Sequence, residues 1–104
     1  MRVVILEDER SASENLKYLL GETDSSIRVE RVLDTVTEAV AYFSGDYDVE
    51  LAFFDIHLAD DISFEVFKRV DVNIPVIFTT AFDEYALKAF KVNSIDYLLK
   101  PIDE

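Results

Sequence analysis

Carboxylates end two of the most apolar stretches of the sequence. The run LAFF leads directly into Asp55, with further acids at Asp60 and Asp61, and the run RVVIL leads into Glu7 and Asp8. An unpaired carboxylate is costly to bury, because it loses its hydration and gains no compensating partner. The rest of the chain is therefore expected to supply a partner.

Two more groups that could do chemistry follow other apolar runs: Thr80 closes VIFTT, and Lys100 follows IDYLL. Carboxylate oxygens suit Mg²⁺, which also keeps waters and accepts phosphate oxygens. A carboxylate beside Mg²⁺ and the Lys100 ammonium can act as a nucleophile toward a phosphoryl group. The metal, Lys100 and the Thr80 hydroxyl would stabilise charge that develops on the phosphoryl oxygens. This chemistry would phosphorylate Asp55.

A repeated pattern of strands and helices must position these groups. Nearly continuous apolar runs, which are typical of strands covered on both faces, begin at Arg2, Leu51, Val76 and Ile95. A run from Ile27 alternates with charges, as an edge strand would. Helical spacing lies between the runs, over residues 12–20, 36–43, 63–70 and 83–92. The alternation predicts an α/β fold with a doubly wound parallel sheet.

Several residues are predicted to begin or end these helices. Gly21 follows the first helical stripe and is a candidate C-cap. Thr35 and Glu38 have the spacing of a capping box before the second helix, and Asp83 is expected to be the N-cap of the fourth.

In a doubly wound sheet, ligands bind beyond the carboxyl ends of the strands. The acids, Thr80 and Lys100 are therefore expected to meet at one edge of the sheet. The chain stops at KPIDE, with no helix after its last strand. We expect a domain truncated before its final helix, because one sheet face would otherwise lack part of its cover.

Composition limits the range of functions. Half of the 104 residues are hydrophobic, which fits one domain over residues 1–104 with its own core. The absence of Cys excludes disulfides and thiolate chemistry and fits a cytoplasmic protein. A formal charge of −12 opposes direct nucleic-acid binding. No apolar run is long enough to predict a secretory signal or a membrane span.

Taken together, these residues resemble the receiver domains of two-component response regulators over essentially the whole chain. The markers are, in chain order, ED at residues 7–8, FFD ending at Asp55, TTAF with Thr80 and Ala81, and DYLLKP with Tyr97, Lys100 and Pro101. The resemblance implies a five-stranded sheet in the flavodoxin-like order 2-1-3-4-5. It also implies a signalling domain, not an enzyme, which catalyses only its own phosphoryl transfer and dephosphorylation.

By the same resemblance, Asp55 accepts a phosphoryl group from the phosphohistidine of a sensor histidine kinase. Asp8, Asp55 and the backbone carbonyl of His57 would ligate Mg²⁺, with Glu7 acting through a water. Thr80 would bind a phosphoryl oxygen, and Tyr97 would turn inward behind it as the switch. A cis peptide bond is implied between Lys100 and Pro101.

The stretch YALKAFKVNSIDYLLKP is most similar to receivers that precede a LytTR-type DNA-binding domain. The resemblance thus implies a transcription regulator whose C-terminal output domain is absent from this chain. The signalling surface would comprise the fourth helix and last strand, and a homodimer of the truncated domain is a further hypothesis.

Three positions depart from the family pattern. Glu7 is one methylene longer than the Asp often found there, which a water bridging to the metal would accommodate. Asp61 replaces a frequent Gly, which would restrict the loop if that position needs positive φ. His57 places an imidazole at the rim of the site, where it could tune access of water to the phosphoryl group.

Three other functions fit parts of the pattern. A flavodoxin shares the architecture, but its phosphate-binding loop would be rich in glycine and hydroxyls, whereas here it reads EDERSAS. An aspartyl-nucleophile phosphatase would carry an acid two residues after Asp55, where this chain has His57. A receiver-like interaction module that works without phosphorylation is the remaining alternative.

Overall fold

The computed structural model describes residues 1–80 and 94–99, the last range and Thr80 as backbone only. Strands and helices alternate along the chain as predicted. They are β1 (Arg2–Leu6), α1 (Arg10–Thr23), β2 (Arg28–Leu33), α2 (Val36–Ser44), β3 (Leu51–Asp55), α3 (Glu65–Arg69), β4 (Val76–Thr80) and β5 (Ser94–Leu99). The predicted fourth helix, with its N-cap Asp83, lies outside the described residues.

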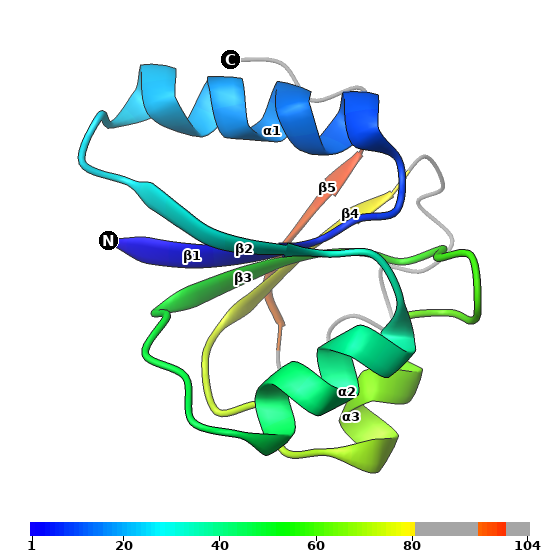
Figure 1. The fold of residues 1–104 in the computed structure, drawn as a ribbon. Coiled ribbons are helices and arrows are strands. Elements are labelled where there is room, and N and C mark those ends of the chain that lie inside the picture. The colour runs from blue at the N-terminus through cyan, green and yellow to red at the C-terminus, as the bar shows by residue number, and fades with distance from the viewer. Residues whose placement is uncertain (81–93, 100–104) are drawn as a thin grey trace.

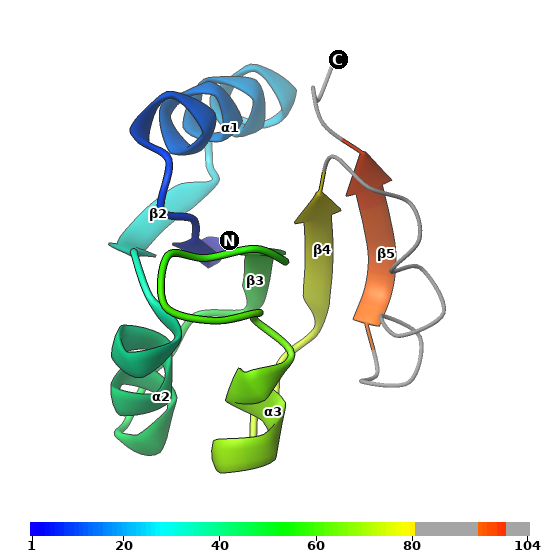
Figure 2. The same cartoon turned by 90° about the vertical axis from the view of Figure 1, so that its right-hand side faces the viewer.

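The strands form one parallel sheet with helices on both faces. Its order is β2-β1-β3-β4-β5. Helix α1 covers one face, and α2 and α3 cover the other (Figure 1). Figure 2 shows β2 and β5 at opposite edges of the sheet. The predicted flavodoxin-like α/β class with a parallel sheet is confirmed, and β1 to β4 have the predicted order 2-1-3-4.

Burial along the strands follows their place in the sheet. Four of the five residues in β1 and in β3 are buried, because helices cover both faces of these central strands. In β2 only Leu33 is fully buried, as predicted for a strand at the edge. Successive side chains alternate between the faces, so Val4 and Phe54 join the cluster under α2 and α3, while Val3 and Phe53 join the cluster under α1.

Helix α2 begins at the predicted cap. The Thr35 hydroxyl accepts a hydrogen bond from the Glu38 backbone N–H at 3.0 Å. The Glu38 carboxylate reaches back and accepts from the Asp34 N–H at 3.1 Å, one residue before the position that a capping box would use. The cap therefore fixes both the start of α2 and the path of the chain as it leaves β2.

Two helix boundaries differ from the predictions. Helix α1 continues past Gly21 to Thr23, and the Asp24 N–H closes it by donating to the Leu20 carbonyl at 3.0 Å. Gly21 has open space around it and only weakens the helix, so it need not end it. Helix α3 begins at Glu65 and not at Ser63, because residues 63 and 64 form a turn first.

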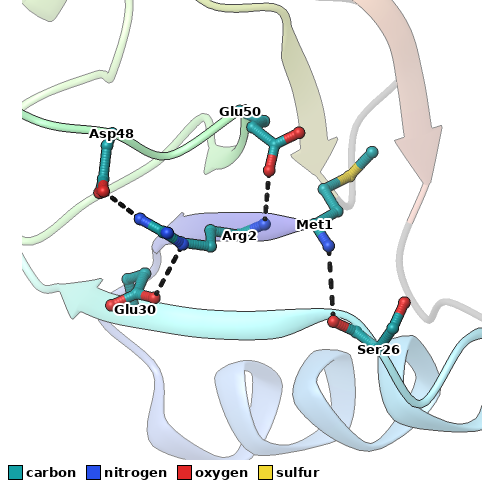
Figure 3. Close-up of polar contacts among 6 residues, drawn as sticks. All are labelled: Met1, Arg2, Ser26, Glu30, Asp48 and Glu50. Carbon is teal, nitrogen blue, oxygen red and sulfur yellow. Dashed lines mark hydrogen bonds and ion pairs between the residues drawn. The ribbon is translucent and has the colours of Figure 1, made fainter.

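At the amino end of the sheet, Arg2 binds several acids (Figure 3). The Arg2 guanidinium pairs with Asp48 and lies 3.8 Å from a Glu30 carboxylate oxygen, and the Arg2 backbone N–H donates to Glu50 at 3.2 Å. The hydrogen bond and charge of Asp48, with smaller contributions from Glu30 and Glu50, raise the pKa of Arg2. The positive charge of Arg2 thus partly balances the acids at this end of the sheet.

Ser63 is an unusual member of the core. Its side chain is fully buried, and its hydroxyl has no hydrogen-bond partner among the residues that the structure describes. Ser63→Ala is expected to raise the free energy of unfolding by about 1 kcal/mol, because a buried unpaired hydroxyl carries a desolvation cost. Urea unfolding measures this, with the exposed Ser44→Ala as the control. A clear loss of stability in Ser63→Ala would contradict the prediction.

Candidate metal centre

Three carboxylates meet at the carboxyl end of the two central strands. Glu7 and Asp8 follow β1, and Asp55 is the last residue of β3. Since Leu6 pairs in parallel register with Phe54, the residues that follow them emerge side by side. One carboxylate oxygen from each acid lies within 4.8 Å of the others. Glu7 and Asp55 are buried, at 5% and 7% exposure, whereas Asp8 is exposed to solvent.

Backbone contacts from neighbouring strands fix this arrangement. The Glu7 N–H donates to the Leu33 carbonyl of β2 at 2.9 Å, and the Glu7 carboxylate accepts from the Glu9 N–H at 3.3 Å. Beyond Asp55, the Ile56 N–H donates to the Thr79 carbonyl of β4 at 3.1 Å. The backbone around Glu7 and Asp55 is therefore held by hydrogen bonds to neighbouring strands.

The donor set fits Mg²⁺. Like charges at this separation repel one another, and a divalent cation relieves that repulsion. Mg²⁺ prefers carboxylate oxygens together with waters, and one member of this trio, Asp8, is open to solvent. Beside the acids is a cavity of about 260 Å³, which Glu7 and Asp8 line together with Arg10 and Lys17 of α1. The cavity gives an incoming group access to this side of the trio.

The loop after Asp55 is a short hairpin. Ser63 N–H donates to the Ile56 carbonyl at 2.7 Å, and Leu58 N–H donates to the Asp61 carbonyl at 3.1 Å. His57 and Ile62 form an antiparallel bridge between these bonds. The hairpin holds the His57 backbone two residues beyond Asp55, where the predicted carbonyl ligand would have to lie.

At the tip of the hairpin, Asp60 binds the start of α2. One carboxylate oxygen accepts from the Val36 N–H at 2.9 Å, and the other accepts from the Thr37 N–H and hydroxyl, both at 3.2 Å. The backbone hydrogen bond from Val36, followed by those from Thr37, lowers the pKa of Asp60. Sequence reasoning missed this contact, because the partners are 23 and 24 residues apart and share no local motif.

Asp61 takes part in the same hairpin. Its carboxylate accepts from the Ile62 N–H at 2.7 Å, and its side chain points toward solvent. The extra acid that departs from the family pattern is thus adjacent to the site but is not one of the three clustered carboxylates.

The remaining predicted site residues are described only in part. Thr80 ends β4, and the backbone of Tyr97 pairs with Phe78 across β4 and β5. The side chains of Thr80 and Tyr97, and all of Lys100 and Pro101, lie outside the described part of the chain. Their roles, and the cis bond, stay predictions.

Comparison with known proteins assigns the family. The family described as response regulator receiver domain matches residues 3–104. The chain belongs to this family. Receiver domains of this family are signalling domains of two-component systems, so the predicted domain type and function class are confirmed.

The receiver is also similar to individual regulators. The sensory transduction proteins LytT of Enterococcus faecalis and Bacillus anthracis are 40% and 36% identical to it over 107 residues. Each comparison covers 100% of this chain but 43% of the relative, so the receiver spans less than half the length of these proteins. The similarity confirms the predicted resemblance to LytTR-type regulators.

Solved structures support the fold. The response regulatory domain of mrkE from Klebsiella pneumoniae superposes with a TM-score of 0.84 at 26% identity, over 99% of this chain and 85% of that one. In the described ranges 1–80 and 94–99, no helix is long and apolar enough to cross a membrane.

Proposed function

We propose that this receiver takes a phosphoryl group onto Asp55 from the phosphohistidine of a sensor histidine kinase. The observation that carries the proposal is the cluster of Glu7, Asp8 and Asp55 at the carboxyl end of the central strands, with oxygens within 4.8 Å. Asp8, Asp55 and the His57 carbonyl would hold Mg²⁺ directly, and Glu7 would hold it through a water.

In the transfer, an Asp55 carboxylate oxygen attacks the phosphorus as the bond from phosphorus to the histidine nitrogen breaks. The leaving imidazole takes up a proton, and Asp55 becomes an acyl phosphate. Mg²⁺, when bound, supplies positive charge to the phosphoryl oxygens. Lys100 and Thr80 would contribute an ammonium and a hydroxyl to the same oxygens.

Dephosphorylation would take place at the same site. Water attacks the phosphorus of the acyl phosphate, and inorganic phosphate leaves while Asp55 regains its carboxylate. The domain would therefore limit the lifetime of its own signal, without turning over external substrates. The His57 side chain, at the rim of the site, would influence how readily that water enters.

The conformational change on phosphorylation would pass through Thr80 and Tyr97 to the edge of the sheet. Thr80 would move toward the phosphoryl group, Tyr97 would turn inward, and the surface of the last strand would change. A C-terminal output domain of the LytTR type would respond by binding DNA in the cytoplasm. This part of the proposal is supported by the similarity to LytT regulators, which are longer than this chain.

The same proposal includes the rest of the receiver architecture. The strand order 2-1-3-4-5 would be complete with β5 at the edge, which its parallel register with β4 supports. A final helix beyond residue 104 would cover part of one sheet face, and the bond before Pro101 would be cis.

Intact-mass measurement after incubation with acetyl phosphate tests the proposal. We expect one phosphoryl adduct that requires Mg²⁺ and is lost when EDTA is added before the phosphodonor. Asp55→Asn should abolish the adduct, and the exposed neighbour variant Asp61→Asn should keep it. If the protein forms no adduct, or if Asp55→Asn still forms one, Asp55 is not the phosphoacceptor and the interaction-module alternative gains support.

A further inference from the structure

Each backbone N–H group in the first turn of α2 has a hydrogen-bond acceptor, and for half of these groups the acceptor belongs to a residue distant in the sequence. Val36 and Thr37 donate to Asp60, whereas Glu38 and Ala39 donate to the hydroxyl and the carbonyl of Thr35. The exposed amino end of a helix needs such acceptors, and it favours an anion. Thr35 provides the local cap, and Asp60 adds acceptor oxygens from a segment outside the helix.

We infer that Asp60 is a positioning residue for the metal centre, tying the loop that follows the phosphoacceptor to α2. The inference rests on the proposed function, because it assigns a role toward the Mg²⁺ site. Asp60 itself is not one of the clustered acids and acts through the hairpin that carries His57.

The hairpin has no spare length between Asp60 and the site. Its tip consists only of residues 59 and 60, because Leu58 already bonds to Asp61 across the turn. Only Leu58 and Ala59 separate Asp60 from His57. The two hydrogen bonds that flank His57, at Ile56 with Ser63 and at Leu58 with Asp61, hold its backbone in the hairpin. A fixed tip therefore fixes the backbone next to Asp55.

The contact also sets orientation, because both carboxylate oxygens are used. One oxygen accepts from Val36, and the other accepts twice from Thr37. An asparagine has only one acceptor oxygen, and its amide N–H₂ would face a donor on the helix. The chemistry at this position therefore requires a carboxylate, and Asn should not replace it fully.

Mg²⁺ is sensitive to this kind of support. It demands a nearly ideal octahedron of oxygens, so a small shift of a backbone carbonyl weakens binding. Residues that orient metal ligands typically change affinity by about 10–100-fold when they are replaced. We expect Asp60→Ala to weaken Mg²⁺ binding by about tenfold and Asp60→Asn to weaken it by a smaller factor.

Thr35→Ala is the matched control. It removes the other side-chain cap from the same turn of α2, at the Glu38 N–H, and leaves the hairpin contacts in place. Both variants should lower the melting temperature, because each removes an acceptor from the helix start. Only the Asp60 variants should lower the affinity for Mg²⁺.

Titration calorimetry measures the affinity for Mg²⁺ of the protein and the three variants, and it tests the inference. Amide hydrogen exchange adds a second readout: Mg²⁺ should slow exchange at Val36 and Thr37 in the protein and in Thr35→Ala, but not in Asp60→Ala. Unchanged affinity in Asp60→Ala, or an equal loss in Thr35→Ala, would overturn the inference and leave Asp60 as a helix cap. Failure of the protein itself to bind Mg²⁺ would instead count against the proposed function.

Discussion

Asp8→Asn is expected to weaken Mg²⁺ binding by at least about tenfold and to slow phosphorylation by acetyl phosphate in proportion. Asp8 is the solvent-exposed member of the three clustered carboxylates, so it can meet a hydrated ion first. The amide keeps the shape of the side chain but removes its charge, and a neutral oxygen is a weaker ligand for a hard dication. The loss should appear in the Mg²⁺ titration and in the rate of adduct formation.

A charge-matched control lies in the same cavity. Asp34 lines it beside Asp8 but does not belong to the three clustered acids. Asp34→Asn removes the same unit of charge, so it should change Mg²⁺ affinity by less than about twofold through screened, longer-range attraction. Equal effects of the two variants would show that only the overall negative potential matters, and would count against a direct role for Asp8.

Phe54→Ala is expected to lower the free energy of unfolding by about 3–5 kcal/mol. The Phe54 ring is fully buried at the centre of the sheet, and its centroid lies 5.9 Å from that of Phe43, 5.6 Å from Phe67 and 6.1 Å from Phe78. Removing it opens a cavity between α2, α3 and β4 that rigid aromatic neighbours fill poorly. Since domains are stable by only about 5–15 kcal/mol, the variant should lose a large fraction of its stability.

Urea unfolding followed by circular dichroism measures the loss. Tyr18→Ala is the control, because the Tyr18 side chain on α1 is 63% exposed and should change stability by less than about 0.5 kcal/mol. A loss below about 1 kcal/mol in Phe54→Ala would mean that the core rearranges to fill the space. Since Phe54 precedes Asp55, the variant should also reduce phosphorylation under conditions where it is partly unfolded.

The sheet and the acid cluster could be predicted because buried strands have a recognisable pattern in the sequence. Strands covered on both faces read as continuous apolar runs, as in RVVIL and LAFF, and parallel strands must end at the same edge. A carboxylate after each run, at Glu7, Asp8 and Asp55, then has to meet the others. The Thr35 cap was predictable for a similar reason, because its partner Glu38 lies three residues away.

Contacts between segments that are distant in the sequence have no such pattern. The carboxylate of Asp60 reaches the start of α2, but nothing near either end of that contact marks the other. The end of α1 was predicted too early for a different, local reason. A helix tolerates an interior Gly at a cost of only about 1 kcal/mol, and the helix instead ends where the Asp24 N–H donates to the Leu20 carbonyl. The turn at Ser63 shortened α3 for a comparable reason, since the hairpin bond to Ile56 holds the Ser63 backbone.

The two-residue tip of the hairpin has a consequence for protein engineering. Because Ala59 and Asp60 span the turn with no residue to spare, one inserted residue would move Asp60 away from Val36 or shift His57 relative to Ile62. Grafting a longer loop from another receiver into this one would therefore require a new acceptor for the start of α2. Loop length and helix cap form a single transferable unit, and chimeras should exchange the two together.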